Sequence, residues 1–451
     1  MATPAHPPDP AAVLRSRNYV GLLIIAAILG VPISAAAYGF LALVNYLQQE
    51  LFTRLPHGLG FATAPAWWPL PMLVIGAVLA AGAIRYLPGR GGPSPSGGFA
   101  MHAPPTPAQL PGVICAALAT LAFGAVLGPE MPLIALGGGL GVLAIRLSKR
   151  RNVPDRAVSM VAASGSFAAI SALLGSPILG AFLLMEASGL AGATLEVVLV
   201  PGLLAAGVGS LIFTGLGSLT GLGTYSLAIP GLPPVGHPYA SEFGWAVAAG
   251  LAAALIGPGI RWLGRLVYGY AERHLLPVLV LAGLVVAALA IGYAEATGRP
   301  VSDVLFSGEN SIGPLVEHGA GFTVGALLLL MACKGLAYGV SLGSFRGGPV
   351  FPGLFIGAAG GVALSHLPGL PLVAGVAIGM GAMSVVMLTL PMTSVLLATL
   401  LLGSDGLAVM PAVIVAVVVA YVASAWITPR PAAGGEPAPA PAPRLSGSRS
   451  D

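Results

Sequence analysis

The segment Val126-Leu127-Gly128-Pro129-Glu130-Met131-Pro132 interrupts a long apolar region of the chain. Gly128 permits a tight turn, and Pro129 and Pro132 suit the first turn of a helix. The run 133–147 that follows is apolar. The pattern predicts a helix that begins within the apolar region, where its unpaired N–H groups and positive dipole end form an anion site.

Glu130 lies in the first turn of this predicted helix. A carboxylate there can occupy the anion site itself, as a tethered competitor that protonation would release. We expect Gly128, Pro129, Glu130 and Met131 to form an anion-binding turn, with Glu130 as its gate and proton acceptor. The alternative is a glutamate that only stabilises the helix start. An ionisable group in an apolar span is costly, and this favours a function.

A second interruption, Gly347-Gly348-Pro349-Val350-Phe351-Pro352-Gly353, has the same composition. Its Gly348 and the N–H groups of Val350 and Phe351 are predicted to form a second anion-coordinating turn. Taken alone, a segment of this composition is more often a loop between spans. Lys334 and Arg346 lie nearby and would either raise the local positive potential or extend to the membrane interface. The two breaks lie at similar distances from the starts of two apolar halves, which is typical of a transporter built from repeats.

Three further sets of polar residues are candidates. Ser94 and Ser96, in a Gly/Pro/Ser-rich segment, would line an inner anion site or belong to a flexible loop. Glu186 ends an apolar run and is either an inner proton carrier or a helix-end carboxylate. Asp303 and Glu309 lie in a polar loop and are expected to be solvated.

The composition of the chain is that of a membrane protein. Of its 451 residues, 56% are hydrophobic and 8% are charged, and the mean hydropathy is +0.93. A soluble domain is about a quarter charged, so the chain is predicted to be an all-α, polytopic membrane protein. Breaks inside the apolar runs, at Gly175-Ser176-Pro177 and at Leu390-Pro391, predict re-entrant and half-length helices. Two cysteines and seven isolated histidines predict neither a metal site nor a cofactor. The net charge is +4, but the basic residues lie in short loops between apolar segments, so they do not suggest binding to nucleic acid.

Basic residues predict the topology. Fifteen of the 19 can be assigned to one side of the membrane, and the loop 217–240 has none, so it should face outward. We expect a cytoplasmic N-terminus over 1–18, a membrane domain over 19–427 and a disordered cytoplasmic tail over 428–451. The membrane domain divides into halves at about 19–216 and 242–427. The predicted location is the inner cell membrane, and a cleaved signal peptide is the rival interpretation of the first apolar run.

Together these motifs resemble the CLC family of chloride channels and chloride/proton antiporters, in its prokaryotic type without a regulatory domain. The family's G-R/K-E-G-P motif is similar to residues 128–132, its G-x-F-x-P motif to 348–352, and its N-A-P-L segment to 175–186. The resemblance implies inverted repeats, a homodimer with one pore per subunit, and anion coordination by helix N-termini with Glu130 as gate. Pro129 replaces the family's basic residue.

The resemblance leaves two functions open. The inner acidic residue that follows the N-A-P-L segment in the antiporters falls on Ala187, so a proton relay group is missing. We therefore expect a passive chloride channel gated by Glu130. The alternative is a proton-coupled antiporter of chloride or of another halide such as fluoride. A membrane-embedded enzyme is disfavoured because the spans carry few convergent polar groups. A cation-coupled symporter is disfavoured because helix N-termini attract anions.

Overall fold

The structure is a computed structural model of the chain, and it is all-helical. It describes residues 14–148, 154–189, 192–220, 229 and 239–428. The helices are α2 (Arg17–Gln49), α3 (Leu55–Gly58), α4 (Pro69–Tyr86), α5 (Leu110–Leu121), α6 (Glu130–Leu147), α7 (Asp155–Leu174), α8 (Pro177–Ser188), α9 (Gly192–Thr220), α10 (Ala240–Arg273), α11 (Leu275–Thr297), α12 (Ile312–Glu317), α13 (Val324–Ser344), α14 (Val350–Ser365), α15 (Leu372–Leu388), α16 (Pro391–Leu400) and α17 (Gly406–Ile427). The predicted tail, most of the N-terminal segment and most of the loop 217–240 lie outside the described residues.

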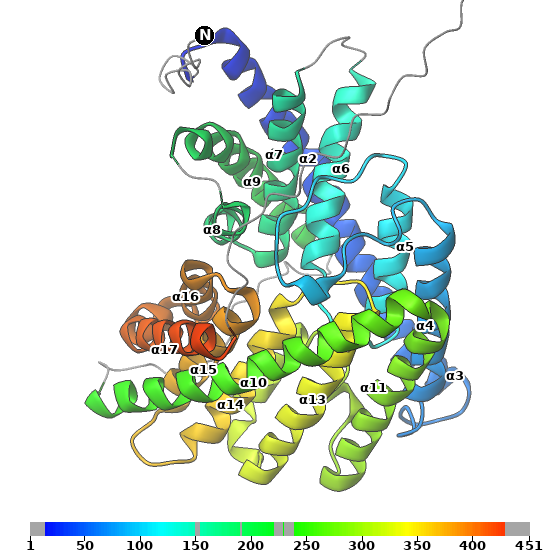
Figure 1. Cartoon of the computed structure of the whole chain (residues 1–451), viewed down its shortest axis with the longest axis vertical. Helices are drawn as coiled ribbons and strands as arrows, with labels where there is room; N and C mark the ends of the chain where they lie inside the picture. The colour runs from blue at the N-terminus through cyan, green and yellow to red at the C-terminus, as the bar shows by residue number, and fades with distance from the viewer. Residues whose placement is uncertain (1–13, 149–153, 190–191, 221–228, 230–238, 429–451) are drawn as a thin grey trace, which may run out of the picture.

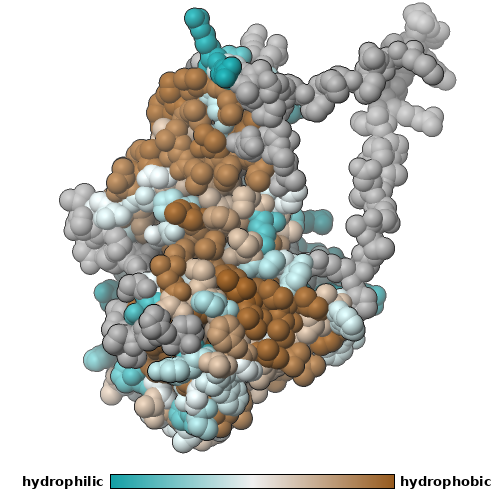
Figure 2. Space-filling model, turned by 90° about the vertical axis from the view of Figure 1, so that its left-hand side faces the viewer, coloured by the Kyte–Doolittle hydropathy of each residue, from teal (hydrophilic) through white to brown (hydrophobic). Residues whose placement is uncertain are grey.

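The helices have the length and the surface of membrane spans. Within the described ranges, nine helical segments are long and apolar enough to cross a bilayer. Large apolar side chains such as Leu211, Leu407 and Trp426 are exposed on the outside of the bundle. Figure 2 shows hydrophobic surface over much of one side of the molecule. Exposed apolar surface of this extent suits lipid and not water, so the chain is a multi-pass membrane protein, as predicted.

The two halves of the chain lie next to each other, and each contains a matching pair of helices (Figure 1). In α6 and α7, a Cβ at Gly137 would overlap the backbone of Gly165. In α14 and α15, a Cβ at Gly357 would overlap the backbone of Gly379. Gly137 and Gly357 are each the eighth residue of their helix. Small residues let helix backbones approach closely, and the shared register shows that one structural unit occurs twice.

The next helix of each unit begins in the same way. Gly175 ends α7 in the left-handed conformation at φ 62°, and Pro177 begins α8 two residues later. Thr389 ends α15 at φ 59°, and Pro391 begins α16 two residues later. With 12 and 10 residues, α8 and α16 are too short to cross a bilayer. The expected half-length helices are therefore present, at the predicted Pro breaks.

Candidate anion-binding site

The first turns of α6 and α14 meet in the interior of the protein. The residues before them, Pro129 and Pro349, have nearly the same backbone angles, with φ −84° and ψ 0° against φ −94° and ψ 1°. Just upstream, Gly128 and Gly348 form an antiparallel bridge, with N···O distances of 2.8 and 2.5 Å. The two breaks that were identified separately in the sequence thus form one structural element.

The carboxylate of Glu130 occupies the N-terminus of α14. Its side chain is completely buried, and the N–H of Phe351 donates to its Oε1 at 3.0 Å. The amide of Val350 also faces the carboxylate. Oε2 has no hydrogen-bond partner among the described residues. A free anion bound at this helix end would use the same amides.

Two glycines make room for this carboxylate. A Cβ built on Gly128 or on Gly348 would overlap the carboxylate oxygens of Glu130. A larger residue at either position would therefore displace the carboxylate from its present place.

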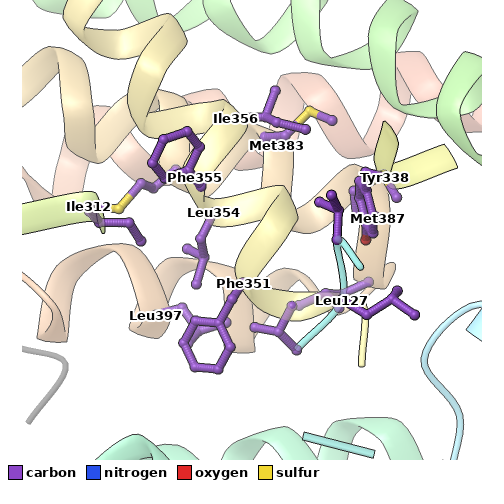
Figure 3. Close-up of a cluster of buried hydrophobic side chains, with 14 of the residues drawn as sticks. Leu127, Ile312, Tyr338, Phe351, Leu354, Phe355, Ile356, Met383, Met387 and Leu397 are labelled. Atoms are coloured by element: carbon purple, nitrogen blue, oxygen red, sulfur yellow. The ribbon is translucent and has the colours of Figure 1, made fainter. Parts of the chain in front are cut away.

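The side chains around the meeting point hold the two breaks in place. Tyr338 on α13 is fully buried, and its hydroxyl donates to the carbonyl of Pro349 at 2.6 Å. The hydroxyl of Ser341, on the same helix, accepts from the N–H of Val126 at 3.2 Å. Figure 3 shows Tyr338 in the buried cluster that also contains Leu127 and Met387. These apolar side chains lower the local dielectric constant, which strengthens the electrostatic interactions of the site.

Met131, which was expected to belong to the anion-binding turn, is buried in the first turn of α6. Its side chain lines a separate cavity of about 510 Å³ between α6, α7 and the segment that precedes α5. No hydrogen bond in the described part of the chain joins Met131 to the carboxylate of Glu130. The helix turns after Glu130, so consecutive side chains point in different directions.

A small cavity of about 40 Å³ lies directly beside the Glu130 turn, and we call it the Glu309 cavity. It is lined by Leu41, Val44, Asn45, Gln48, Leu121, Leu127, Pro129, Ser307, Glu309 and Asn310. The expectation that Asp303 and Glu309 are solvated is wrong. Glu309 is half-buried in this cavity, and Asp303 accepts from the hydroxyl of Tyr293 at 3.1 Å.

A larger cavity of about 230 Å³, the Arg261 cavity, brings together one of the predicted serines and two arginines. Ser96, Arg261, Arg265 and Tyr421 are among its lining residues. Two guanidinium groups give it a positive potential that suits anions.

Ser94 and Ser96 belong to an ordered turn and not to a flexible loop. Ser94 accepts from the N–H of Ser96 and caps a 3-10 helix over Pro95–Gly97. The two hydroxyls lie 3.0 Å apart. Within the described residues no hydrogen bond links either serine to Glu130, so the structure does not place them in the same coordination shell.

Glu186 is held at the start of α16. Its carboxylate accepts from the N–H of Met392 at 3.0 Å, and from the N–H and hydroxyl of Thr393 at 2.8 and 2.7 Å. A carboxylate at a helix N-terminus pairs with unsatisfied N–H groups and with the positive dipole end. This contact links α8 to α16.

Lys334, which the sequence analysis considered only for its positive charge near the second break, holds another segment of the chain in place. Its side chain is completely buried in α13, and its Nζ donates to four carbonyls of the segment 303–306 at 3.0 to 3.4 Å. The ammonium also lies 4.4 Å from the centre of the Phe355 ring. A charged residue in the middle of an apolar span was the available signal, because such a group needs internal partners.

The fold and this site define a polytopic membrane protein in which two helix N-termini meet in the interior around a buried carboxylate. Residues 72–425 match the family described as voltage gated chloride channel, and the chain belongs to that family, usually abbreviated CLC. Anion transport across a membrane is therefore its general function, and the family consists of transporters and not enzymes.

Similar proteins agree with this assignment. "Putative ion-transport protein YfeO" of Escherichia coli O9:H4 (strain HS) is 31% identical over 364 residues, which cover 79% of this chain and 82% of that protein. The protein of the same name in Shigella boydii serotype 4 (strain Sb227) is 30% identical over the same shares.

Two solved structures share the fold. The "X-ray crystal structure of a slow cyanobacterial Cl-/H+ antiporter" superposes with a TM-score of 0.74 at 18% identity and covers 91% of this chain and 95% of that one. The "Crystal structure of a CLC-type fluoride/proton antiporter" superposes with a TM-score of 0.65, also at 18% identity, and covers 90% and 95%.

Proposed function

We propose that the protein exchanges a small anion, chloride or another halide, for protons, and that Glu130 is the group that moves. The observation that carries the proposal is the burial of the Glu130 carboxylate on the N–H of Phe351. This is the position that a transported anion would take, so the carboxylate and the anion exclude each other. We thus propose the proton-coupled antiporter, and not the passive channel that the sequence alone favoured.

Protonation supplies the coupling between the two ions. An ionised carboxylate makes charge-assisted hydrogen bonds that are about twice as strong as neutral ones. A proton on Glu130 weakens its bond to Phe351 and removes its attraction to the helix dipole. A halide can then occupy the amides, and the neutral side chain carries the proton away from them. The two similar structures described as antiporters support this choice.

The sides of the membrane follow from the basic residues. Helix α6 extends about 27 Å from Glu130 to Leu147 at 1.5 Å per residue, and Arg146 lies at its far end. Basic residues favour the cytoplasmic side, so we place Glu130 and the Glu309 cavity toward the outside. The Arg261 cavity then opens toward the cytoplasm, where its two arginines would concentrate anions before they reach the site.

The proton route on the cytoplasmic side differs from a simple carboxylate relay. Glu186 is engaged by α16, and the next residue, Ala187, cannot carry a proton. We therefore propose that water in the Arg261 cavity delivers protons on that side. The cavity is large enough to hold several water molecules.

The remaining features of the proposal follow from the family and from the apolar runs. We infer an inner-membrane location, both termini in the cytoplasm, a membrane domain over 19–427 and a homodimer with one pathway per subunit. Cross-linking in native membranes would test the dimer, and cysteine labelling of introduced terminal residues would test the orientation.

Reconstituted protein provides the decisive measurement. In liposomes with opposed anion and pH gradients, an antiporter has a reversal potential that depends on both gradients, whereas a channel follows the anion gradient alone. An outward halide gradient should also drive protons against their own gradient. Parallel assays with chloride and fluoride identify the preferred anion. A reversal potential that ignores pH would contradict the proposal.

A further inference from the structure

The segment between α11 and α13 carries Glu309 into the cavity beside the Glu130 turn, and the segment is held there firmly. The buried Nζ of Lys334 binds four consecutive carbonyls over 303–306. The N–H of Phe306 donates to the carbonyl of Gly124 at 3.3 Å, and its ring packs edge-on against Phe52 with centroids 4.9 Å apart. These contacts fix the position of Phe306, and Glu309 follows three residues later in the chain.

The Glu309 cavity extends from this carboxyl to the residue next to the gate, and the charge of Glu130 acts on Glu309. Pro129, the residue directly before Glu130, lines the cavity together with Glu309. The volume of about 40 Å³ is enough for at least one water molecule. Asn45, Ser307 and Asn310 offer the polar partners that an ordered water requires.

The surroundings of Glu309 contain one other titratable group, Glu130, among the described residues. The cavity residues of α2, Asn45 and Gln48, are uncharged. The ammonium of Lys334 is directed to the carbonyls of 303–306. Burial, reinforced by the negative charge of Glu130, raises the pKa of Glu309 to about 8.

We propose that Glu309 is the outer proton relay of the exchange cycle, which passes protons between external water and Glu130 through water in the Glu309 cavity. The inference rests on the proposed function. In the inward direction, the Glu309 carboxyl gives its proton to the cavity water while that water protonates the Glu130 carboxylate. The Glu309 carboxylate then takes a new proton from the outside. The step moves one proton and changes no covalent bond other than O–H bonds.

The test compares proton and anion fluxes of the full-length protein in liposomes. Glu309→Gln should slow coupled proton uptake by about a hundredfold, the lower end of what a positioned acid–base group contributes. Glu309→Asp should restore part of the rate. Glu317→Gln, which changes an exposed carboxylate in the same segment between α11 and α13, should behave as wild type.

A second variant separates a relay from damage to the fold. In a Glu130→Gln background, where no proton is accepted, adding Glu309→Gln should leave anion flux unchanged. A reduced flux in the double variant would mean that Glu309 shapes the anion pathway, and it would overturn the relay. If Glu309→Gln keeps the wild-type proton-to-anion ratio and the wild-type rate, the relay is overturned and the proposed function stands. If the wild-type protein moves no protons, the relay and the proposed function are both overturned.

Discussion

Phe351 donates its backbone N–H to the carboxylate of Glu130 across 221 residues of sequence, at 3.0 Å. Each group is buried, and each belongs to the first turn of a broken helix. The contact places the side chain of one repeat on the first turn of a helix in the other. Under the proposed exchange, Glu130 must leave these amides before an anion can bind them.

Replacing Glu130 with Gln should uncouple the two ions. The amide cannot be ionised, so it can neither carry a proton nor compete with an anion by charge. We expect anion flux to persist, to lose its pH dependence and to move no protons, as measured in liposomes with a pH-sensitive dye. Glu295→Gln, an exposed carboxylate on α11, is the matched control. Unchanged pH dependence in Glu130→Gln would contradict its role as gate.

Gly348→Ala should displace the carboxylate without removing it. The new Cβ would overlap Oε2 of Glu130, and overpacking of this kind costs about 1–3 kcal/mol. We expect the closed state to be less populated and anion flux at neutral pH to rise by about tenfold, since 1.4 kcal/mol corresponds to a factor of ten. Gly325→Ala is the control, because its Cβ would meet nothing within 4 Å. Wild-type flux in Gly348→Ala would show that the carboxylate does not limit transport.

Changes at Glu186 should affect stability more than coupling. Glu186→Ala removes the acceptor for the amides of Met392 and Thr393, and hydrogen bonds to a charged group contribute about 2 kcal/mol. We expect a lower thermal midpoint in detergent, whereas Glu186→Gln should retain proton transport. Loss of proton transport in Glu186→Gln with an unchanged midpoint would instead identify an inner proton carrier.

Lys334→Met should loosen the segment that carries Glu309. The substitution leaves four carbonyls without their donor, and those of Val304 and Leu305 are buried. We therefore expect a loss of about 3 kcal/mol in the free energy of unfolding. Hydrogen exchange should increase over 303–311 in particular. Arg85→Met, which removes an exposed cation at the end of α4, should leave this exchange unchanged. If hydrogen exchange over 303–311 is as slow in Lys334→Met as in wild type and in Arg85→Met, Lys334 does not hold the segment.

The stability of the folded protein should fall as pH rises because of Glu309. Its pKa is about 8 in the folded protein against an ordinary value of 4.5, so the folded state holds a proton that the unfolded state has lost. Between these two values, stability decreases with rising pH. Thermal midpoints between pH 5 and pH 9 should therefore decline less in Glu309→Gln than in wild type. Parallel declines in the two proteins would show that Glu309 is already ionised at low pH.

Much of the fold follows from local sequence. The breaks at Gly128-Pro129 and Gly348-Pro349, and the half-length helices that begin at Pro177 and Pro391, lie where Gly and Pro interrupt apolar runs. These residues act on their own backbone, so neighbouring positions suffice to predict them. Glu130 was recognisable for the same reason, as an acidic residue in the first turn after such a break.

Other parts of the site depended on distant partners and were missed. Glu309 was expected to be solvated because its own segment is polar, yet α2 and the turn before α6 enclose it. The partner of Glu186, Thr393, lies 207 residues further along the chain and could not be foreseen from the residues around Glu186. Nothing near Lys334 in sequence indicated that the carbonyls of 303–306 would surround its ammonium.

Apolar periodicity and Gly/Pro breaks alone thus specified an all-α membrane protein with interrupted spans and an acidic group at one interruption. Only the folded arrangement decided that Glu130 meets the amide of the opposite repeat, and that Glu309 stands next to the gate. The physical reason is that turns and helix starts are determined over a few neighbouring residues. Burial, hydrogen-bond partners and the pKa of a carboxyl depend instead on what other segments of the chain bring to it.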